Sequence, residues 1–279
     1  MTPLLNTGPL SHSIDDYPSG IVLPIDKPYR WTSADVIRKI KYAAIRHFGK
    51  KNLKVGHAGT LDPLATGILI VCIGNATKRA QELQDSDKEY VAGIAFGATT
   101  PSYDREKEID ARFPLYGVSE EALRSVLPSF LGEQDQVAPL FSAKSVDGIR
   151  AYERARKLYK AGKPLSEAEG LLNTSRIKIS ELELLSFDPL ALSGKPTRED
   201  LPASAASSRI NVIETSGEGL PVAKVRIACS KGTYIRAFAR DLGEALGSGA
   251  FLDSLCRTRS GNYKIEDALS LEDALKLFV

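Results

Sequence analysis

The stretch from residue 56 to residue 73, GHAGTLDPLATGILIVCI, joins a glycine-rich loop to a continuous apolar run. The apolar run, Ile68 to Ile73, is bounded by glycines on both sides, which is typical of a strand buried on both faces. In the loop, three glycines permit backbone conformations that side chains forbid, and Pro63 biases Asp62 away from helical geometry. The sequence therefore predicts that Asp62 lies on a stiff loop directly before a buried strand.

Helical and strand patterns alternate on both sides of this stretch. Thr32 or Ser33 is expected to cap the first helix, and Ser270 the last. Strands are predicted at residues 20–26, 88–96, 176–187 and 222–228, and helices at residues 32–48, 119–131, 148–161 and 234–246.

Length and composition describe an ordinary globular protein. The chain has 279 residues, enough to bury a sizeable core without disulfide or metal support. Its three cysteines have no paired spacing, which predicts reduced thiols and a cytoplasmic protein. No apolar run approaches the roughly 18 residues of a membrane span. Residues 1–19 form a polar tail that contains proline, expected to be flexible and not a signal peptide.

Charge is segregated along the chain, although the formal total is only +2. Three segments are strongly basic: Val36 to His57 carries seven cations and no acid, Lys144 to Lys163 nets +5, and Lys224 to Arg240 also nets +5. Each could be a solvated helix face. Together they favour a nucleic-acid partner, because lysine and arginine that neutralise phosphates release counterions.

Several residues are candidates for chemistry, each with a plain structural alternative. Asp62 is a candidate nucleophile or general base, since a carboxylate near cations can stay ionised when partly buried. Arg236 enters the last long helix, where a cation in the first turn needs an acidic partner. Tyr90 and Tyr234 lie beside cations and could stack on bases or simply pack in the core. His57 has no nearby His or Cys at ligand spacing, so a metal site is not expected.

Together these residues resemble one family, the TruB tRNA pseudouridine synthases. The segment Gly56 to Gly67 looks like the signature of that family. Further similar stretches follow in the order of the family at residues 20–32, 74–78, 87–90, 139–156, 229–241 and 255–263. The resemblance covers the chain from about Gly20 onward, and the run of Pro-Leu-Ala-Thr-Gly after Asp62 is similar to the stand-alone bacterial type.

The resemblance implies a cytoplasmic isomerase that converts uridine at position 55, in the T arm of tRNA, to pseudouridine without cofactor or metal. Asp62 would be the nucleophile, attacking either C6 of the uracil or C1′ of the ribose. Tyr90 would stack on the base and take part in proton transfer, and Arg236 would pair with Asp62. The remaining substrate-binding residues would be His57, Tyr234 and Leu255. No obligatory protein partner is implied, and a monomer is expected.

The resemblance also implies the architecture: an α+β fold with a mixed, mostly antiparallel sheet, flanking helices, and two lobes around a cleft that holds Asp62. Residues 20–279 would form the catalytic domain, with an RNA-gripping insertion at residues 137–168. Residues 186–221, rich in Ser, Ala and Pro, are expected to be a long loop insertion. Only sixteen residues follow Tyr263, so the C-terminal PUA-type domain of many bacterial members is expected to be absent.

The chain departs from the pattern of the family after the strand that contains Tyr90. It has Thr100-Pro101-Ser102-Tyr103-Asp104 and then Lys107 where a glycine is usual. Asp104 still fits the second acid of the motif. Two other functions stay open: a non-catalytic RNA-binding protein, and the catalytic subunit of a guide-RNA particle.

Overall fold

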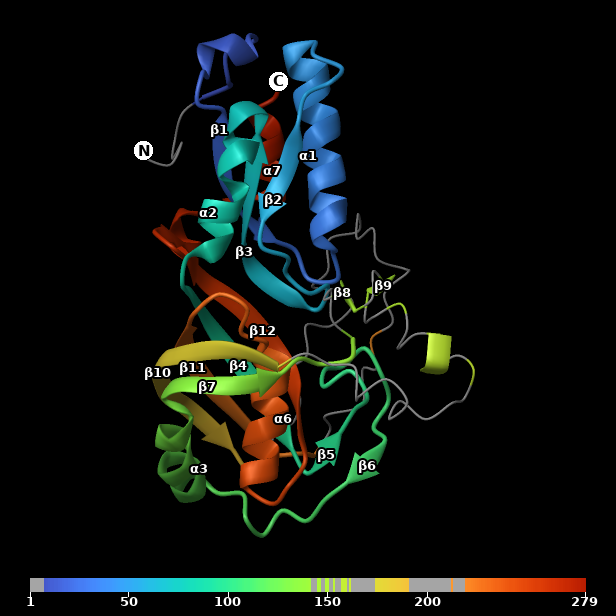
Figure 1. Cartoon of the computed structure of the whole chain (residues 1–279), viewed down its shortest axis with the longest axis vertical. Coiled ribbons are helices and arrows are strands. Elements are labelled where there is room, and N and C mark those ends of the chain that lie inside the picture. Colours follow the sequence, from blue (N-terminus) through green and yellow to red (C-terminus); the bar gives the residue numbers. More distant parts are fainter. Residues whose placement is uncertain are drawn as a thin grey trace. The chain divides into compact units, whose positions relative to one another are not determined.

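The computed structural model describes residues 8–141, 145–146, 149–150, 153, 157–159, 161, 174–190, 212 and 219–279. These residues fall into two compact units (Figure 1). The first unit takes in residues 8–91 and 255–279, and the second takes in the described residues between 92 and 254. Across those ranges, none of the helices has the length and apolar composition of a membrane span.

Strand β3 (Ala65–Ile73) is the centre of the first unit. One edge pairs antiparallel with β1 (Ile21–Lys27). The other edge is shared: the start of β3 pairs parallel with β12 (Ala250–Ser260), and its end pairs antiparallel with β2 (Val55–Ala58). Short strands extend this sheet, with β14 (Leu269–Ser270) beside β1 and β13 (Tyr263–Lys264) beside β12.

Both faces of β3 are buried, as its apolar run predicts. Leu69, Val71 and Ile73 pack in one core cluster, with residues of α1 (Ser33–Phe48) and α7 (Leu271–Lys276). Ile68, Ile70 and Cys72 pack in a second cluster. Around the second cluster lie the 3-10 helices Gly74–Arg79 and Ile265–Asp267 and helix α2 (Ala80–Asp85).

The chain before β1 packs onto the first unit. Leu10 is buried and donates its backbone N–H to the carbonyl of Leu277 at 2.9 Å. A short 3-10 helix, Ile14–Asp16, is capped by Ser13. Apolar side chains of residues 8–19 thus pack in or against the same core cluster as residues of α1 and α7, while the flexibility expected of the tail stays a prediction.

The second unit is built on an antiparallel sheet. Its longest strand, β10 (Thr174–Asp188), pairs with β11 (Val222–Cys229) on one side and with β7 (Gly132–Val137) on the other. Strand β4 (Lys88–Phe96) lies between β11 and β12 in the sheet order, and both β4 and β12 contribute residues to each unit.

The helices of the second unit are α6 (Ile235–Ala245) and α3 (Glu120–Val126), the latter followed by the 3-10 helix Leu127–Phe130. Phe238 of α6 lies against Phe130, with ring centroids 5.4 Å apart. Two small hairpins complete the described part of this unit: β5 (Ala98–Thr99) with β6 (Ala111–Arg112), and β8 (Ser145–Val146) with β9 (Ile149–Arg150).

The α+β class and the mixed, mostly antiparallel sheet are confirmed. Two local predictions are wrong. The glycine loop is shorter than expected, because Val55–Ala58 form strand β2. Ile149–Arg150 form a strand, so the helix predicted at 148–161 cannot start there. Strand β10 extends through Asp188 into the predicted loop at 186–221; most of that loop, and most of the predicted insertion at 137–168, lies outside the described residues.

Candidate active site

Asp62 lies on the six-residue loop Gly59 to Leu64, between β2 and β3. Its side chain is half-buried, and its carbonyl accepts a hydrogen bond from the N–H of Ala65 at 3.1 Å, which closes a turn. The loop end is fixed by Asp26, whose carboxylate accepts from the N–H of Gly67 at 2.9 Å. Asp62 is therefore held on a short, hydrogen-bonded loop, in agreement with the prediction from Pro63 and the glycines.

Ser33, in the first turn of α1, holds the residue before Asp62. Its hydroxyl accepts from the N–H of Leu61 and donates to the carbonyl of Leu61, both at 3.0 Å. Thr32 caps the helix, and a capping box with Asp35 fixes its start. The start of α1 thus clamps the backbone that leads into Asp62.

Lys27, the last residue of β1, holds the other side of Asp62. Its buried ammonium donates to the carbonyls of Trp31 at 2.6 Å, Pro28 at 2.9 Å and Pro63 at 3.2 Å. Burial lowers the pKa of Lys27 from 10.5 to about 7, although the charge of Asp62 acts in the opposite direction. The charges of Lys27 and Asp62 therefore interact, so Lys27 also contributes to the electrostatics of the loop.

Arg257 of β12 is a second buried cation beside the loop, 2% exposed. Its Nε donates to the carbonyl of Ile68 at 2.7 Å, and its Nη2 donates to the carbonyl of Gly59 at 3.2 Å. Both Lys27 and Arg257 thus bind backbone oxygens of the Asp62 loop or its flanks.

The other candidates of the first unit are His57, Tyr90 and Leu255. Leu255 is 9% exposed. In the β12–β3 ladder it pairs with Ala65, which follows Asp62 by three residues. His57 lies on β2, and its pKa is lowered by burial and by the charge of Arg257. Tyr90 lies on β4 and is 9% exposed. The structure therefore brings Leu255 next to the strand that starts directly after the Asp62 loop.

Arg236 lies in the second unit, in the first turn of α6, and is 5% exposed. Its guanidinium lies 3.7 Å from the carboxylate of Asp104, and it donates to the carbonyls of Phe141 at 3.0 Å and Ser102 at 3.2 Å. Asp104 also accepts from the hydroxyl of Ser102 at 2.6 Å and from the N–H of Glu106 at 2.9 Å. Among the described contacts, the acidic partner of Arg236 is Asp104, and the pairing with Asp62 stays a prediction.

Tyr234 is the N-cap residue of α6, and Gln136 of β7 holds its backbone. The N–H of Tyr234 donates to the Gln136 side chain at 2.8 Å, and the Tyr234 carbonyl accepts from it at 3.1 Å. Gln136 is 3% exposed, so this double contact is shielded from water. It fixes the start of the helix that carries Arg236.

Lys107, where the family usually has glycine, contacts three residues of the part of the second unit that the structure describes. Its ammonium lies 3.6 Å from the Glu106 carboxylate, 5.0 Å from the ring centre of Tyr159 and 5.7 Å from that of Phe141. The departure from the motif therefore leaves the Asp104–Arg236 ion pair in place.

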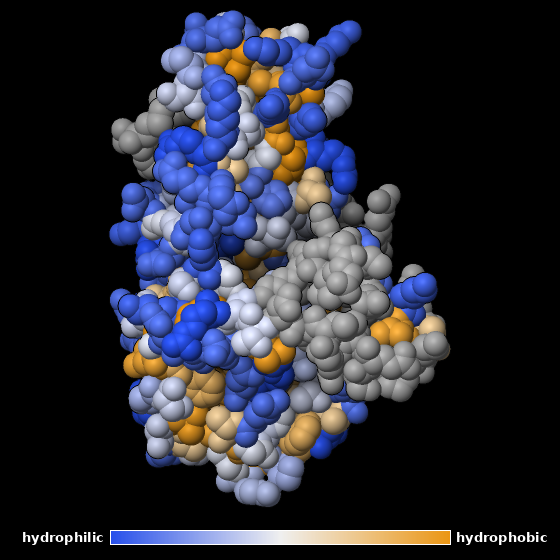
Figure 2. Space-filling view, viewed as in Figure 1, coloured by the Kyte–Doolittle hydropathy of each residue, from blue (hydrophilic) through white to orange (hydrophobic). Residues whose placement is uncertain are grey.

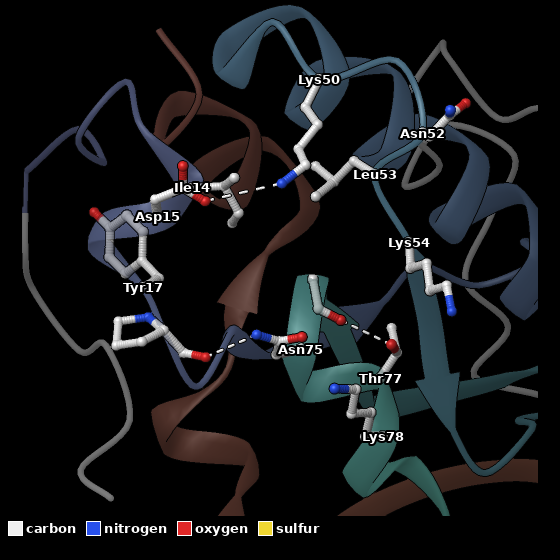
Figure 3. Close-up of a pocket in the computed structure, with 12 residues that line it drawn as sticks. Ile14, Asp15, Tyr17, Lys50, Asn52, Leu53, Lys54, Asn75, Thr77 and Lys78 are labelled. Carbon is white, nitrogen blue, oxygen red and sulfur yellow. Dashed lines mark hydrogen bonds and ion pairs between the residues drawn. The ribbon is translucent and has the colours of Figure 1, made fainter.

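The seven cations of Val36 to His57 are all exposed in the first unit. Figure 2 shows hydrophilic side chains over much of the visible surface of this unit. Beside them lies a cavity of about 510 Å³, which Lys50, Lys54 and Lys78 line from different segments (Figure 3). Lys50 lies 3.8 Å from the carboxylate of Asp15. This surface suits an anionic partner better than an apolar one.

Sequence reasoning missed the residues that hold the loop and the helix, namely Lys27, Ser33, Gln136 and Arg257. Lys27 and Arg257 fall in stretches that resemble the family, but nothing in the local pattern distinguishes a buried cation from an exposed neighbour such as Arg259. For metals, no group of three His, Cys, Asp or Glu side chains in the described ranges is arranged to bind an ion.

Comparison with known proteins assigns the chain to a family. The model of the TruB family pseudouridylate synthase, N-terminal domain, matches residues 46–197, which include Asp62 and Tyr90. The chain belongs to the TruB family. It is accordingly an enzyme, an isomerase of the pseudouridine synthase class. It is 45% identical to tRNA pseudouridine synthase B of Phocaeicola vulgatus, over 92% of each chain.

Other TruB relatives extend the similarity. The chain is 41% identical to tRNA pseudouridine synthase B of Thermus thermophilus, over 89% of this chain and 75% of the relative. Among solved structures, a chain of a Cbf5-Nop10-Gar1 complex superimposes with a TM-score of 0.59 and 26% identity. The match covers 99% of this chain and 59% of that one, so this chain spans well under two thirds of its length.

Proposed function

We propose that this chain isomerises uridine 55 in the T arm of tRNA to pseudouridine, with Asp62 as the nucleophile. The observation that carries the proposal is the 45% identity, over 92% of both chains, to a protein named tRNA pseudouridine synthase B. The geometry of the first unit supports it, because the carboxylate that matches the nucleophile of the family stands on the loop held by Lys27, Ser33 and Arg257.

The reaction breaks the glycosidic bond between C1′ and N1 and forms a bond between C1′ and C5. Asp62 attacks either C6 of the uracil or C1′ of the ribose, and the detached ring turns before it rejoins. The proton on C5 is then lost and N1 gains one, so substrate and product have the same composition. Neither route needs an oxidant, a reductant or a metal.

Several residues are assigned roles around Asp62. Tyr90 stacks on the target base and is the candidate for moving the C5 proton. Arg236 orients the carboxylate of Asp62, and its ion pair with Asp104 fixes the guanidinium in place. Tyr234 and Leu255 line the base pocket, and His57 contacts the RNA beside the vacated stack.

The uridine must leave its stack before Asp62 can reach it, which costs a few kcal/mol. Contacts between phosphates and the exposed cations of residues 36–57 would offset that cost. These contacts predict that RNA binding weakens as salt rises, since each neutralised phosphate releases counterions.

Tritium release from T-arm RNA labelled at C5 of the uridine tests the function. The wild-type protein should release tritium, and the Asp62→Asn variant should lose at least about a thousandfold in kcat, as nucleophile removal does in other enzymes. Asp188→Asn is a matched control, since it removes an exposed carboxylate at the end of β10.

Release by both Asp62→Asn and wild type would contradict the role of Asp62. A wild-type protein that binds the RNA without releasing tritium would instead indicate an RNA-binding protein. Release that appears only after a guide RNA or partner proteins are added would indicate the particle subunit.

A further inference from the structure

The edge of β3 that faces β2 and β12 has a gap in its strand pairing. The parallel ladder with β12 ends at the pair Arg257–Gly67, and the antiparallel ladder with β2 starts at the pair Ala58–Ile70. Ile68 and Leu69 therefore have no partner residue in either ladder. The Asp62 loop leaves β2 at this gap, so backbone groups at its base cannot be satisfied by ordinary sheet pairing.

The side chain of Arg257 fills this gap. Its Nε donates to the carbonyl of Ile68 at 2.7 Å, and its Nη2 donates to the carbonyl of Gly59, the first residue of the loop, at 3.2 Å. Arginine suits this position because its planar fork presents several donors at fixed angles, which a lysine ammonium cannot do. A single side chain thus joins the base of the loop to the strand that follows it.

Gly67 makes room for the backbone of Arg257, whereas Gly59 leaves space for an ordinary contact with its side chain. A Cβ at Gly67 would lie 2.3 Å from the Arg257 carbonyl oxygen, and one at Gly59 would lie 3.8 Å from its Nη1. Both glycines have positive φ, +94° at Gly59 and +95° at Gly67, a conformation that side chains disfavour. Gly67 therefore permits close approach to the Arg257 backbone, and Gly59 provides the backbone conformation at the start of the loop.

We infer that Arg257 is a positioning residue, which sets the place of the Asp62 carboxylate by bridging the carbonyls of Gly59 and Ile68 across the gap. The inference rests on the proposed function for its effect on turnover. Asp62 follows Gly59 by three residues, so a shift of the loop base moves the carboxylate. Misplacement of a reacting group by about 1 Å can cost about a hundredfold in rate.

The first test does not depend on activity. Hydrogen exchange, followed by mass spectrometry, compares wild type with Arg257→Met, which keeps the side-chain length but removes the donors. Amides of the peptide covering residues 57–67 should exchange about tenfold faster, while peptides of β1 and β10 should be unchanged. Arg259→Met is the control, since it removes a cation from the same strand. The only described side-chain hydrogen bond of Arg259 is a long one, 3.5 Å, to the carbonyl of Gly261.

The second test measures turnover on T-arm RNA. Arg257→Met should lower kcat about a hundredfold while the Kd for the RNA changes by less than about threefold. Arg257→Lys, which keeps the charge and one of the two contacts, should retain about ten times the kcat of the Met variant, and Arg259→Met should match wild type.

Equal exchange in Arg257→Met and Arg259→Met would overturn the inference. So would faster exchange in all peptides of the first unit, which indicates a general structural role, or an equal loss of kcat and RNA affinity. If Arg257→Met does not fold, the Lys variant decides by the same comparisons. A wild-type protein inactive on the RNA would refute the proposed function. The hydrogen-exchange comparison would still test whether Arg257 holds the loop through the carbonyls of Gly59 and Ile68.

Discussion

Both units contain buried cations, but the partners of these cations differ. In the first unit, the described hydrogen bonds of Lys27 and Arg257 all go to backbone carbonyls, three for Lys27 and two for Arg257. In the second unit, Arg236 has two carbonyls and the carboxylate of Asp104 as partners. Carbonyl dipoles orient a cation without neutralising it, whereas a carboxylate also compensates its charge.

The buried cations of the two units therefore have different structural roles. The cations of the first unit bind the chain around Asp62 and so determine where a loop lies. The ion pair of the second unit determines where one side chain lies, because the Asp104 carboxylate is itself fixed by Ser102 and the N–H of Glu106. Variants that remove one kind of support and leave the other should therefore have different consequences.

The largest effect is expected for Gly67→Ala in the first unit. Gly67 has φ +95°, and the Cβ of an alanine there would lie 2.3 Å from the carbonyl oxygen of Arg257. Strands β3 and β12 would therefore have to move apart. The loss of stability should exceed about 4 kcal/mol, measured by urea denaturation. Gly132→Ala is the matched control in the second unit, since it has the same φ and open space, and should cost only about 1–2 kcal/mol. Similar losses for both would mean that conformation, and not close packing, decides at Gly67.

Arg236→Ala should lose turnover with RNA binding largely kept, and should cost about 3–5 kcal/mol of stability, because it leaves Asp104 buried without its ion-pair partner. The double variant Asp104→Leu with Arg236→Met should regain most of that stability without regaining turnover. Tritium release and urea denaturation measure the two effects. An equal loss of RNA binding in Arg236→Ala would mean that Arg236 mainly binds phosphate.

Lys27 gives the first unit a pH-dependent stability. Because folding lowers its pKa from 10.5 to about 7, the unfolded chain binds more protons than the folded chain between those values. Its contribution to the free energy of unfolding therefore rises with pH above 7, by at most about 1.4 kcal/mol per pH unit.

The stability advantage of wild type over Lys27→Met should accordingly grow from pH 7 to pH 9, as measured by urea denaturation at each pH. Other titrating groups are common to both proteins and cancel in the difference. An advantage that stays constant or shrinks would show that the ammonium remains charged throughout this range.

The smallest effects are expected where one polar side chain holds backbone next to a candidate residue. Ser33→Ala removes two contacts with Leu61, and Gln136→Ala removes two with Tyr234. Each should cost about 1–3 kcal/mol through unsatisfied buried groups, measured by thermal denaturation. Ser33→Ala should also lower kcat more than RNA affinity. A loss confined to RNA affinity would mean that the Leu61 contact does not position Asp62.

The local pattern predicted most elements of the fold correctly. Strand β4 has its predicted bounds, and α1 begins at Ser33 after the predicted cap. Strands β7 and β12 were missed, because their sequences, GEQDQV and AFLDSLCRTRS, alternate too weakly to indicate a strand. Their place in the sheet depends on partners far away in the chain.

Of the candidate site, too, only part could be predicted from the sequence. Motif resemblance pointed to Asp62 and Arg236. The position of Arg236 in the first turn of a helix predicted an acidic partner, but the resemblance named Asp62 for that place, whereas the described ion pair is with Asp104. The residues that hold the loop were not anticipated, because burial of Lys27 or Arg257 is a property of the tertiary structure. In sequence, Arg257 and Arg259 look alike, although one is almost fully buried and the other is only partly so.

The contacts that complete the Asp62 loop join segments that are made at very different times. Arg257 lies 198 residues after Gly59 and 189 residues after Ile68. Chains grow from the N-terminus at about 5–20 residues per second, so this loop waits more than about ten seconds on the ribosome before Arg257 is synthesised. Non-local contacts of this kind also slow folding. The Asp62 loop therefore stays without these two contacts until late in synthesis, and a ribosome-bound fragment that ends before residue 257 lacks them altogether.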